Sequence, residues 1–240
     1  MDCWAALLGD CAGGFSREHL ISNGIFDDEV ITAFGLAWCK ERPVQIGQAS
    51  AVAKILCKRH NEALSSFDSE ATKLSQFLSA NVLDDPLSEA QTTLRGVLLE
   101  KWALKTFLNL GYVGGLDPEH HTRVLPEAGL ITYLFRDTEV PTGIGLYFVT
   151  GAVSNHGYKI GLSWNAIRNM SDAGVIVGMT FTLNDVRFVV SAAPGPAEKR
   201  IARMGVVNEV DYSKAKILYR PANIVLLSKT AGRKTIILEW

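Results

Sequence analysis

The sequence has little net charge and lacks any long apolar run. Its 240 residues carry a formal net charge of -1, far from the strongly basic balance that is typical of a dedicated nucleic-acid binder. No apolar stretch approaches the roughly 20 residues that a membrane-spanning helix needs. The apolar stretch near the N-terminus is short and lacks the basic start of a secretory signal peptide. We therefore expect a cytoplasmic protein with no membrane partner.

The charges are unevenly distributed along the chain. Acidic residues outnumber basic ones in residues 1–66, whereas basic residues outnumber acidic ones in residues 198–240. The C-terminal end is therefore a candidate contact for a polyanion such as nucleic acid. Lysines and arginines that only solvate a surface explain the same pattern equally well.

Cysteine is scarce, and none of the four cysteines follows Cys57. In a reducing compartment, cysteines are more often metal ligands or free thiols than disulfides. Cys57 and His60 have the C-x-x-H spacing that lets two side chains turn toward one tetrahedral ion. Cys3 and Cys11 are the candidates for the other two ligands of a structural Zn²⁺, with Cys39 as an alternative ligand. The competing interpretation is that these cysteines are small buried apolar side chains.

Hydrophobic spacing divides the chain into a helical part and a strand-rich part. Leu64, Phe67 and Leu74 recur at helical spacing and predict a helix that begins near His60 and ends before Pro86. A second helix is predicted over 88–110. Short β-branched or aromatic runs, separated by Gly, Asn, Asp and Pro, predict strands, with a helix inserted near 197–204. The predicted strands cover residues 130–135, 145–150, 158–164, 175–182, 186–191, 224–227 and 235–240.

The residues around Glu18-His19 and Asn61 carry a family resemblance. The order C…C…E-H…C-x-x-H-N, within residues 3–68, resembles the HNH endonucleases, particularly their zinc-bearing branch, which includes phage endonuclease VII. The resemblance implies a hairpin that carries the acidic residue and the histidine, and a following helix that carries the asparagine. A structural zinc ion would hold the hairpin against that helix.

The expected fold class is therefore α+β, in three segments. Residues 1–68 would form an N-terminal zinc-stapled ββα-metal (HNH) module, and residues 69–85 a helical linker. Residues 86–240 would form a helix plus a mostly antiparallel β-sheet domain of unknown role.

The resemblance also implies an activity and the roles of individual residues. It implies a metal-dependent endonuclease that hydrolyses phosphodiester bonds, in DNA rather than RNA, with His19 as the general base. An imidazole with an ordinary pKa of about 6.5 suits proton abstraction at neutral pH. Glu18 and Asn61 would be oxygen ligands of a catalytic Mg²⁺ or Mn²⁺. Arg17 is a candidate phosphate contact or an ordinary strand charge.

Departures from the family pattern leave a second interpretation open. The family more often has Asp at the position of Glu18, and no histidine follows Asn61 within the next turn. Ser65 or Asp68 would then contribute to the metal through water. The alternative is a catalytically inactive, zinc-stabilised module that binds nucleic acid or protein. A homodimer is also open, as is a regulatory ligand or partner at the C-terminal domain.

Overall fold

The computed structural model describes residues 2–34, 39, 41–80, 89–117, 119–120, 122–150, 162–169, 174–184, 186–204, 206–207, 210–227 and 233–240. Over these residues the chain is α+β, which confirms the predicted class. The α-helices are α1 (Lys58–Ala63), α2 (Ser65–Ser79), α3 (Gly96–Tyr112), α4 (Ala128–Phe135) and α5 (Ala197–Ala202). The 3-10 helices are η1 (Ala6–Leu8), η2 (Asn23–Ile25) and η3 (Gln48–Ser50).

The strands form one large sheet and several smaller ones. Their bounds are β1 (Phe15–His19), β2 (Val30–Ala33), β3 (Val44–Gly47), β4 (Val52–Cys57), β5 (Glu89–Arg95), β6 (Gly145–Thr150), β7 (Leu162–Arg168), β8 (Ile176–Leu183), β9 (Val186–Ser191), β10 (Val206–Val207), β11 (Val210–Asp211), β12 (Lys216–Tyr219), β13 (Asn223–Leu227) and β14 (Arg233–Glu239). The largest sheet has the order β12-β6-β9-β8-β7 and is antiparallel throughout. A second sheet has the order β13-β14-β5, in which β14 runs parallel to β5. The mostly antiparallel prediction is thus confirmed, with this one parallel pair added.

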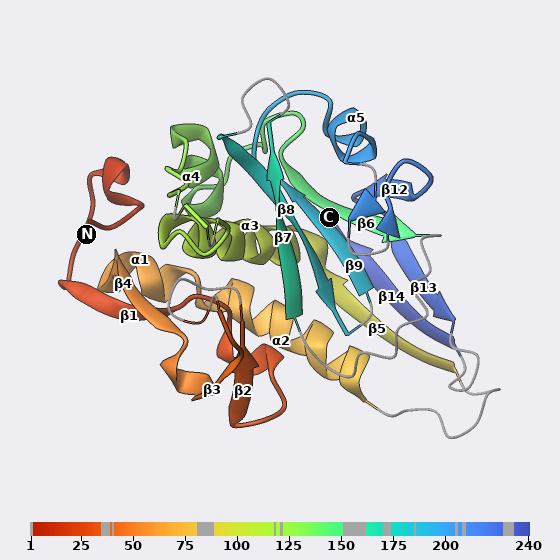
Figure 1. The fold of residues 1–240 in the computed structure, drawn as a ribbon, viewed down its shortest axis with the longest axis horizontal. Coiled ribbons are helices and arrows are strands. Elements are labelled where there is room, and N and C mark those ends of the chain that lie inside the picture. The colour runs from red at the N-terminus through yellow and green to blue at the C-terminus, as the bar shows by residue number, and fades with distance from the viewer. Residues whose placement is uncertain are drawn as a thin grey trace.

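Helix α3 lies at the centre of the molecule (Figure 1), where it contacts α2, α4 and strands β5, β6, β9 and β14. Its sequence is apolar on nearly every face, which is typical of a helix enclosed on all sides. Four polar side chains are nevertheless buried on it: Glu100, Lys105, Thr106 and Asn109. Burial of such groups is costly unless each is hydrogen-bonded, so their partners identify the polar connections of the core.

One continuous cluster of buried apolar side chains joins the N-terminal elements to the large sheet. It includes Trp4 and Leu56 from the first segment, Trp102 from α3, and Phe181 and Phe188 from β8 and β9. The rings of Trp102 and Phe181 meet edge to face, with centroids 5.6 Å apart. Residues on both sides of the predicted module boundary near residue 68 therefore share one core. The division into three segments stays a prediction.

One predicted helix is confirmed from Gly96 onward but begins too early, and one predicted strand is a helix. The helix predicted from residue 88 begins only at Gly96, because 89–95 form strand β5 with alternating burial, paired along its length with β14. Residues 130–135 belong to helix α4 rather than to a strand; a short apolar run does not by itself distinguish the two. Strands β6 and β9 and helix α5 confirm the predictions for 145–150, 186–191 and 197–204. Residues 81–88 and 158–161 lie outside the described part of the chain.

No helix in the described part of the chain has both the length and the apolar composition needed to cross a bilayer.

Candidate metal centre and adjacent polar network

Strand β1 pairs antiparallel with β4, and helix α1 follows β4 without a loop. Phe15 lies opposite Cys57 in this pair, and His19 lies opposite Val52. Cys57 is the last residue of the strand and His60 lies in the first turn of the helix, so the change of direction brings their side chains together. The intervening chain forms the separate β2–β3 pair. The local arrangement is therefore strand, strand and helix, with an insert between the two strands.

Four side chains converge where the N-terminal segment meets this unit. Ligand atoms of Cys3, Cys11, Cys57 and His60 all lie within 4.8 Å of one another. The Nδ1 atom of His60 lies 3.3 Å from the Sγ of Cys3, 3.7 Å from that of Cys11 and 3.2 Å from that of Cys57. Three thiols and one imidazole are a donor set of structural zinc sites. The group could hold a metal ion such as zinc.

Backbone hydrogen bonds keep the N-terminal segment in place beside the cluster. The N–H of Trp4 donates to the carbonyl of Ile55 at 3.0 Å, and the N–H of Lys58 donates to the carbonyl of Gly14 at 2.8 Å. Trp4 follows Cys3 and Gly14 lies shortly after Cys11, so the N-terminal segment is tied to β4 and to the start of α1 near each of its two cysteines. Cys39, the alternative ligand of the sequence analysis, is buried but does not belong to this group.

Asp10 orients the histidine of the cluster. Its Oδ1 lies 2.9 Å from Nε2 of His60, the ring nitrogen that faces away from the thiols. Because Nδ1 faces the sulfurs, the matching tautomer carries its proton on Nε2 and donates it to Asp10. A carboxylate on the second ring nitrogen is the usual partner of a metal-bound histidine. Arg59 and Arg136 flank the other oxygen of Asp10, at 3.0 and 3.4 Å.

The electrostatic environment favours the charged forms of Asp10 and Cys57, whereas burial raises the pKa of the Cys3 and Cys11 thiols above the ordinary value. The hydrogen bond to His60, with the nearby arginines, holds the pKa of Asp10 below its ordinary value. Burial by itself would raise the pKa of Cys57, but hydrogen bonds from the backbone N–H groups of His60 and Ala12 lower it below its ordinary value. A thiol whose deprotonated form is stabilised in this way suits a metal ligand.

Glu18 points away from solvent and is engaged in a buried ion pair. Its side chain is 3% exposed, and its Oε1 accepts from the Nζ of Lys105 at 2.6 Å and from the Nδ2 of Asn109 at 3.1 Å. Lys105 in turn lies 2.7 and 2.8 Å from the two carboxylate oxygens of Asp68. Burial raises the pKa of the Glu18 carboxyl, and the Lys105 ammonium opposes that rise.

The ion pair belongs to a longer hydrogen-bonded network on α3. Ser22 donates through its hydroxyl to Asp68, and the indole N–H of Trp102 donates to Ser22 at 2.8 Å. At the other end, Trp4 donates to Asn109 at 3.0 Å, and Asn109 donates to the backbone carbonyl of His19 at 3.1 Å. Helix α3 thereby holds β1 through side chains, in addition to the apolar core.

His19 is half-buried beside this network. Among the described residues its Nε2 atom is buried and has no hydrogen-bond partner. Burial first, and then the positive charges of Lys105 and Arg17, lower the pKa of the imidazole below its ordinary value. His19 is therefore neutral at neutral pH. A neutral imidazole with an unengaged nitrogen can accept a proton.

Asn61 connects α1 to β1. Its Nδ2 donates to the hydroxyl of Ser16 at 2.8 Å and to the backbone carbonyl of Arg17 at 3.3 Å. The Arg17 side chain is exposed.

In the described part of the chain, the Cys/His cluster is the one group of three or more His, Cys, Asp or Glu side chains near enough together to hold an ion. Glu18, His19 and Asp68 do not form such a group.

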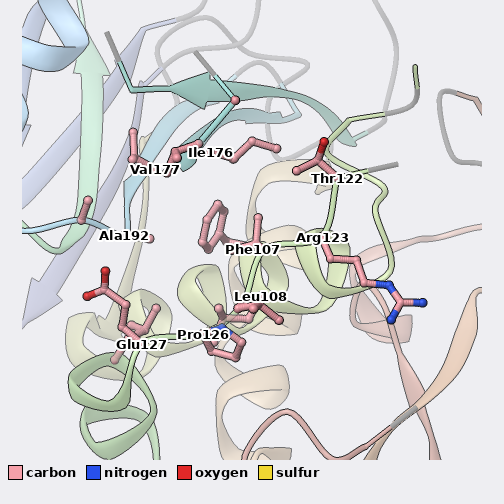
Figure 2. A pocket seen from close by; sticks show the side chains of 15 residues that line it. Phe107, Leu108, Thr122, Arg123, Pro126, Glu127, Ile176, Val177 and Ala192 are labelled. Atoms are coloured by element: carbon pink, nitrogen blue, oxygen red, sulfur yellow. The ribbon is translucent and has the colours of Figure 1, made fainter. Parts of the chain in front are cut away.

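A cavity of about 310 Å³ lies on the C-terminal side of α3 (Figure 2). Its lining includes Phe107 of α3 and, from β8, Ile176 and Val177. Leu130 of α4 also lines it, and Leu125 in the segment before that helix is largely exposed. The lining is mostly apolar, as is usual for small-molecule sites.

Taken together, the chain is an α+β protein with a candidate Cys₃His metal centre and a buried ionic network beside it. Comparison with protein-family models, curated proteins and solved structures gives no significant match.

Proposed function

We propose that this protein hydrolyses phosphodiester bonds in nucleic acid, with His19 as the general base and a structural zinc ion as the support of the site. The observation that carries the proposal is the state of His19, whose buried Nε2 has no hydrogen-bond partner among the described residues and whose pKa is lowered. A base that stays unprotonated at neutral pH is what this chemistry needs.

The surroundings of His19 support the same assignment. It lies at the end of β1, which pairs with β4 and is followed by α1, and the side chain of Asn61 links that helix to β1. The zinc ion, bound by the three cysteines and His60, would hold the N-terminal segment against β4 and α1. This order of strand, strand, helix and zinc is the one that the HNH resemblance implies.

The chemical step assigned to this chain's residues is a proton transfer. Substrate binding would first have to open the buried Nε2 of His19 to water. A water molecule then gives a proton to this nitrogen as its oxygen bonds to phosphorus, and the bond from phosphorus to the departing sugar oxygen breaks. The departing oxygen takes its proton from solvent. In this proposal the exposed guanidinium of Arg17, which helps to lower the pKa of His19, would contact the phosphate.

The family resemblance implies that Glu18 and Asn61 bind a catalytic Mg²⁺ or Mn²⁺. Their contacts in the structure do not fit such an ion. A hard cation needs free oxygen ligands. Oε1 of Glu18 instead lies 2.6 Å from a lysine ammonium, which would repel the ion. Asn61 donates through its amide nitrogen to β1, so its amide oxygen is the atom left for an ion, and one amide oxygen alone is too few ligands for such a cation.

A second candidate function follows from the same ion pair. Because Glu18 is paired with Lys105, it is not available as a ligand of a catalytic metal ion. This favours a zinc-stabilised module that binds nucleic acid or protein without cleaving it. The two candidates share the zinc centre and differ in the need for His19.

Cleavage of supercoiled plasmid DNA and of a labelled RNA, with and without added Mg²⁺ or Mn²⁺, separates them. Three proteins are compared: wild type, His19→Ala, and His120→Ala as a control at a histidine whose side chain is 72% exposed. The proposal expects cleavage by wild type and the control, its loss in His19→Ala, and one zinc per chain in all three. A wild-type protein with one zinc that leaves both substrates intact refutes the hydrolytic function and favours the binding module.

A further inference from the structure

The ammonium of Lys105 is enclosed by carboxylate oxygens. The side chain is 1% exposed, and its Nζ lies 2.6 Å from Oε1 of Glu18 and 2.7 and 2.8 Å from Oδ1 and Oδ2 of Asp68. An ammonium has three N–H donors, and both carboxylates lie within hydrogen-bond distance of them. The two carboxylates come from β1 and α2, and the lysine comes from α3.

This lysine stands where an apolar side chain would otherwise be expected. Its neighbours on α3, Leu104 and Phe107, are fully buried. A lysine in such surroundings is stable as a cation only if anionic partners are fixed around it. Here they are fixed, because Ser22 donates to Asp68 and Asn109 donates to Glu18. The network is therefore organised around a positive charge.

We infer that Lys105 is a built-in cation that fills the site between Glu18 and Asp68, so that the protein does not bind Mg²⁺ or Mn²⁺ through Glu18. The three groups together carry one net negative charge with the lysine present. A divalent ion entering the site would have to displace the ammonium from three short contacts. The inference concerns metal binding and does not depend on whether the chain cleaves nucleic acid.

Removal of the lysine should convert the site into one that takes a metal ion. In Lys105→Ala the two carboxylates, held by their other hydrogen bonds, would face a space without a positive charge. Oxygen ligands of this kind suit Mn²⁺. Lys105→Met, which keeps more of the side-chain volume, provides a second variant in case the alanine variant does not fold.

The test is Mn²⁺ binding by the zinc-loaded full chain, measured from the loss of the free-ion signal in electron paramagnetic resonance. The inference expects wild type and Glu18→Gln to bind Mn²⁺ equally weakly. Lys105→Ala or Lys105→Met should bind one ion at least about tenfold more tightly, and adding Glu18→Gln should abolish that gain. Lys101→Ala removes a partly exposed lysine of the same helix and should gain nothing.

Wild-type binding of one Mn²⁺ that is lost in Glu18→Gln would overturn the inference, whether or not the lysine variants fold. So would a folded lysine variant that gains no site. A wild-type protein that neither binds Mn²⁺ nor cleaves nucleic acid leaves the inference intact and refutes the proposed hydrolysis. One that binds Mn²⁺ through Glu18 and cleaves refutes the inference alone.

Discussion

Replacing Asp10 should weaken zinc binding although Asp10 is not a ligand. Its carboxylate accepts from Nε2 of His60 at 2.9 Å, while Nδ1 of the same ring faces the three thiols. The hydrogen bond selects the tautomer whose Nδ1 lone pair is free, and it fixes the plane of the ring. In Asp10→Ala both effects are lost, so part of the binding free energy must be spent on orienting His60.

The size of the effect follows from the contacts that remain. Loss of such a carboxylate partner lowers metal affinity by about 10- to 100-fold, which corresponds to about 1.4 to 2.7 kcal/mol. Asp10 is itself 25% exposed, so water can partly replace it as the acceptor in Asp10→Ala and the effect should lie toward the lower end. Asp10→Asn keeps an acceptor oxygen and loses the charge, so its effect should be the smaller of the two.

Competition with a chromophoric zinc chelator at neutral pH measures this affinity directly. Asp28→Ala, at an exposed acidic residue, is the matched control and should bind zinc as wild type does. Equal zinc affinity in Asp10→Ala and wild type would refute the assignment of Nε2 as the donor and of Nδ1 as the metal ligand.

The remaining predictions concern His19 and a second buried ion pair of α3, between Glu100 and Arg220. Because the pKa of His19 is lowered, cleavage should persist below pH 6.5, where an ordinary histidine becomes protonated; a rate that falls with a midpoint at or above 6.5 would contradict this. The unfolded chain binds the proton first, so the free energy of unfolding should also fall as the pH drops from 6.5 toward the folded-state pKa, and less so in His19→Ala. Arg220→Ala leaves Glu100, which is 0% exposed, without the guanidinium 2.7 Å away, and should lower the free energy of unfolding by about 3 kcal/mol in urea titrations. Arg233→Ala, at an exposed pair 3.7 Å apart, should change it by less than about 1 kcal/mol, and equal losses in the two variants would exclude the buried pair as the cause.

The sequence contains enough local information to propose the four residues of the metal cluster. Cys57 and His60 are close in the chain, and their spacing alone brings them together at a strand-to-helix junction. Cys3 and Cys11 were candidates mainly because few cysteines exist. Asp10 was missed; its position next to Cys11 was the available signal, but an aspartate beside a ligand is too common to identify a partner of the imidazole.

The surroundings of Glu18 could not be predicted from local sequence. Its partners Lys105 and Asn109 lie on a helix far along the chain, and neither stands out in an apolar segment. In the sequence alone, a carboxylate next to a histidine indicates a metal site. In the folded chain, the role of that carboxylate is decided by the side chains that pack against it. The errors at β5 and α4 have a related origin, because pairing with β14 and packing in the core decided those short segments.

Helix α4 connects two features that are distant in the sequence. At its C-terminal end Phe135 meets the ring of His60, with centroids 4.9 Å apart, and the following Arg136 contacts Asp10. Nearer its N-terminal end Leu130 lines the cavity. A helix of eight residues is about 12 Å long. One short helix therefore packs against the candidate metal centre at one end and forms part of the cavity wall near the other.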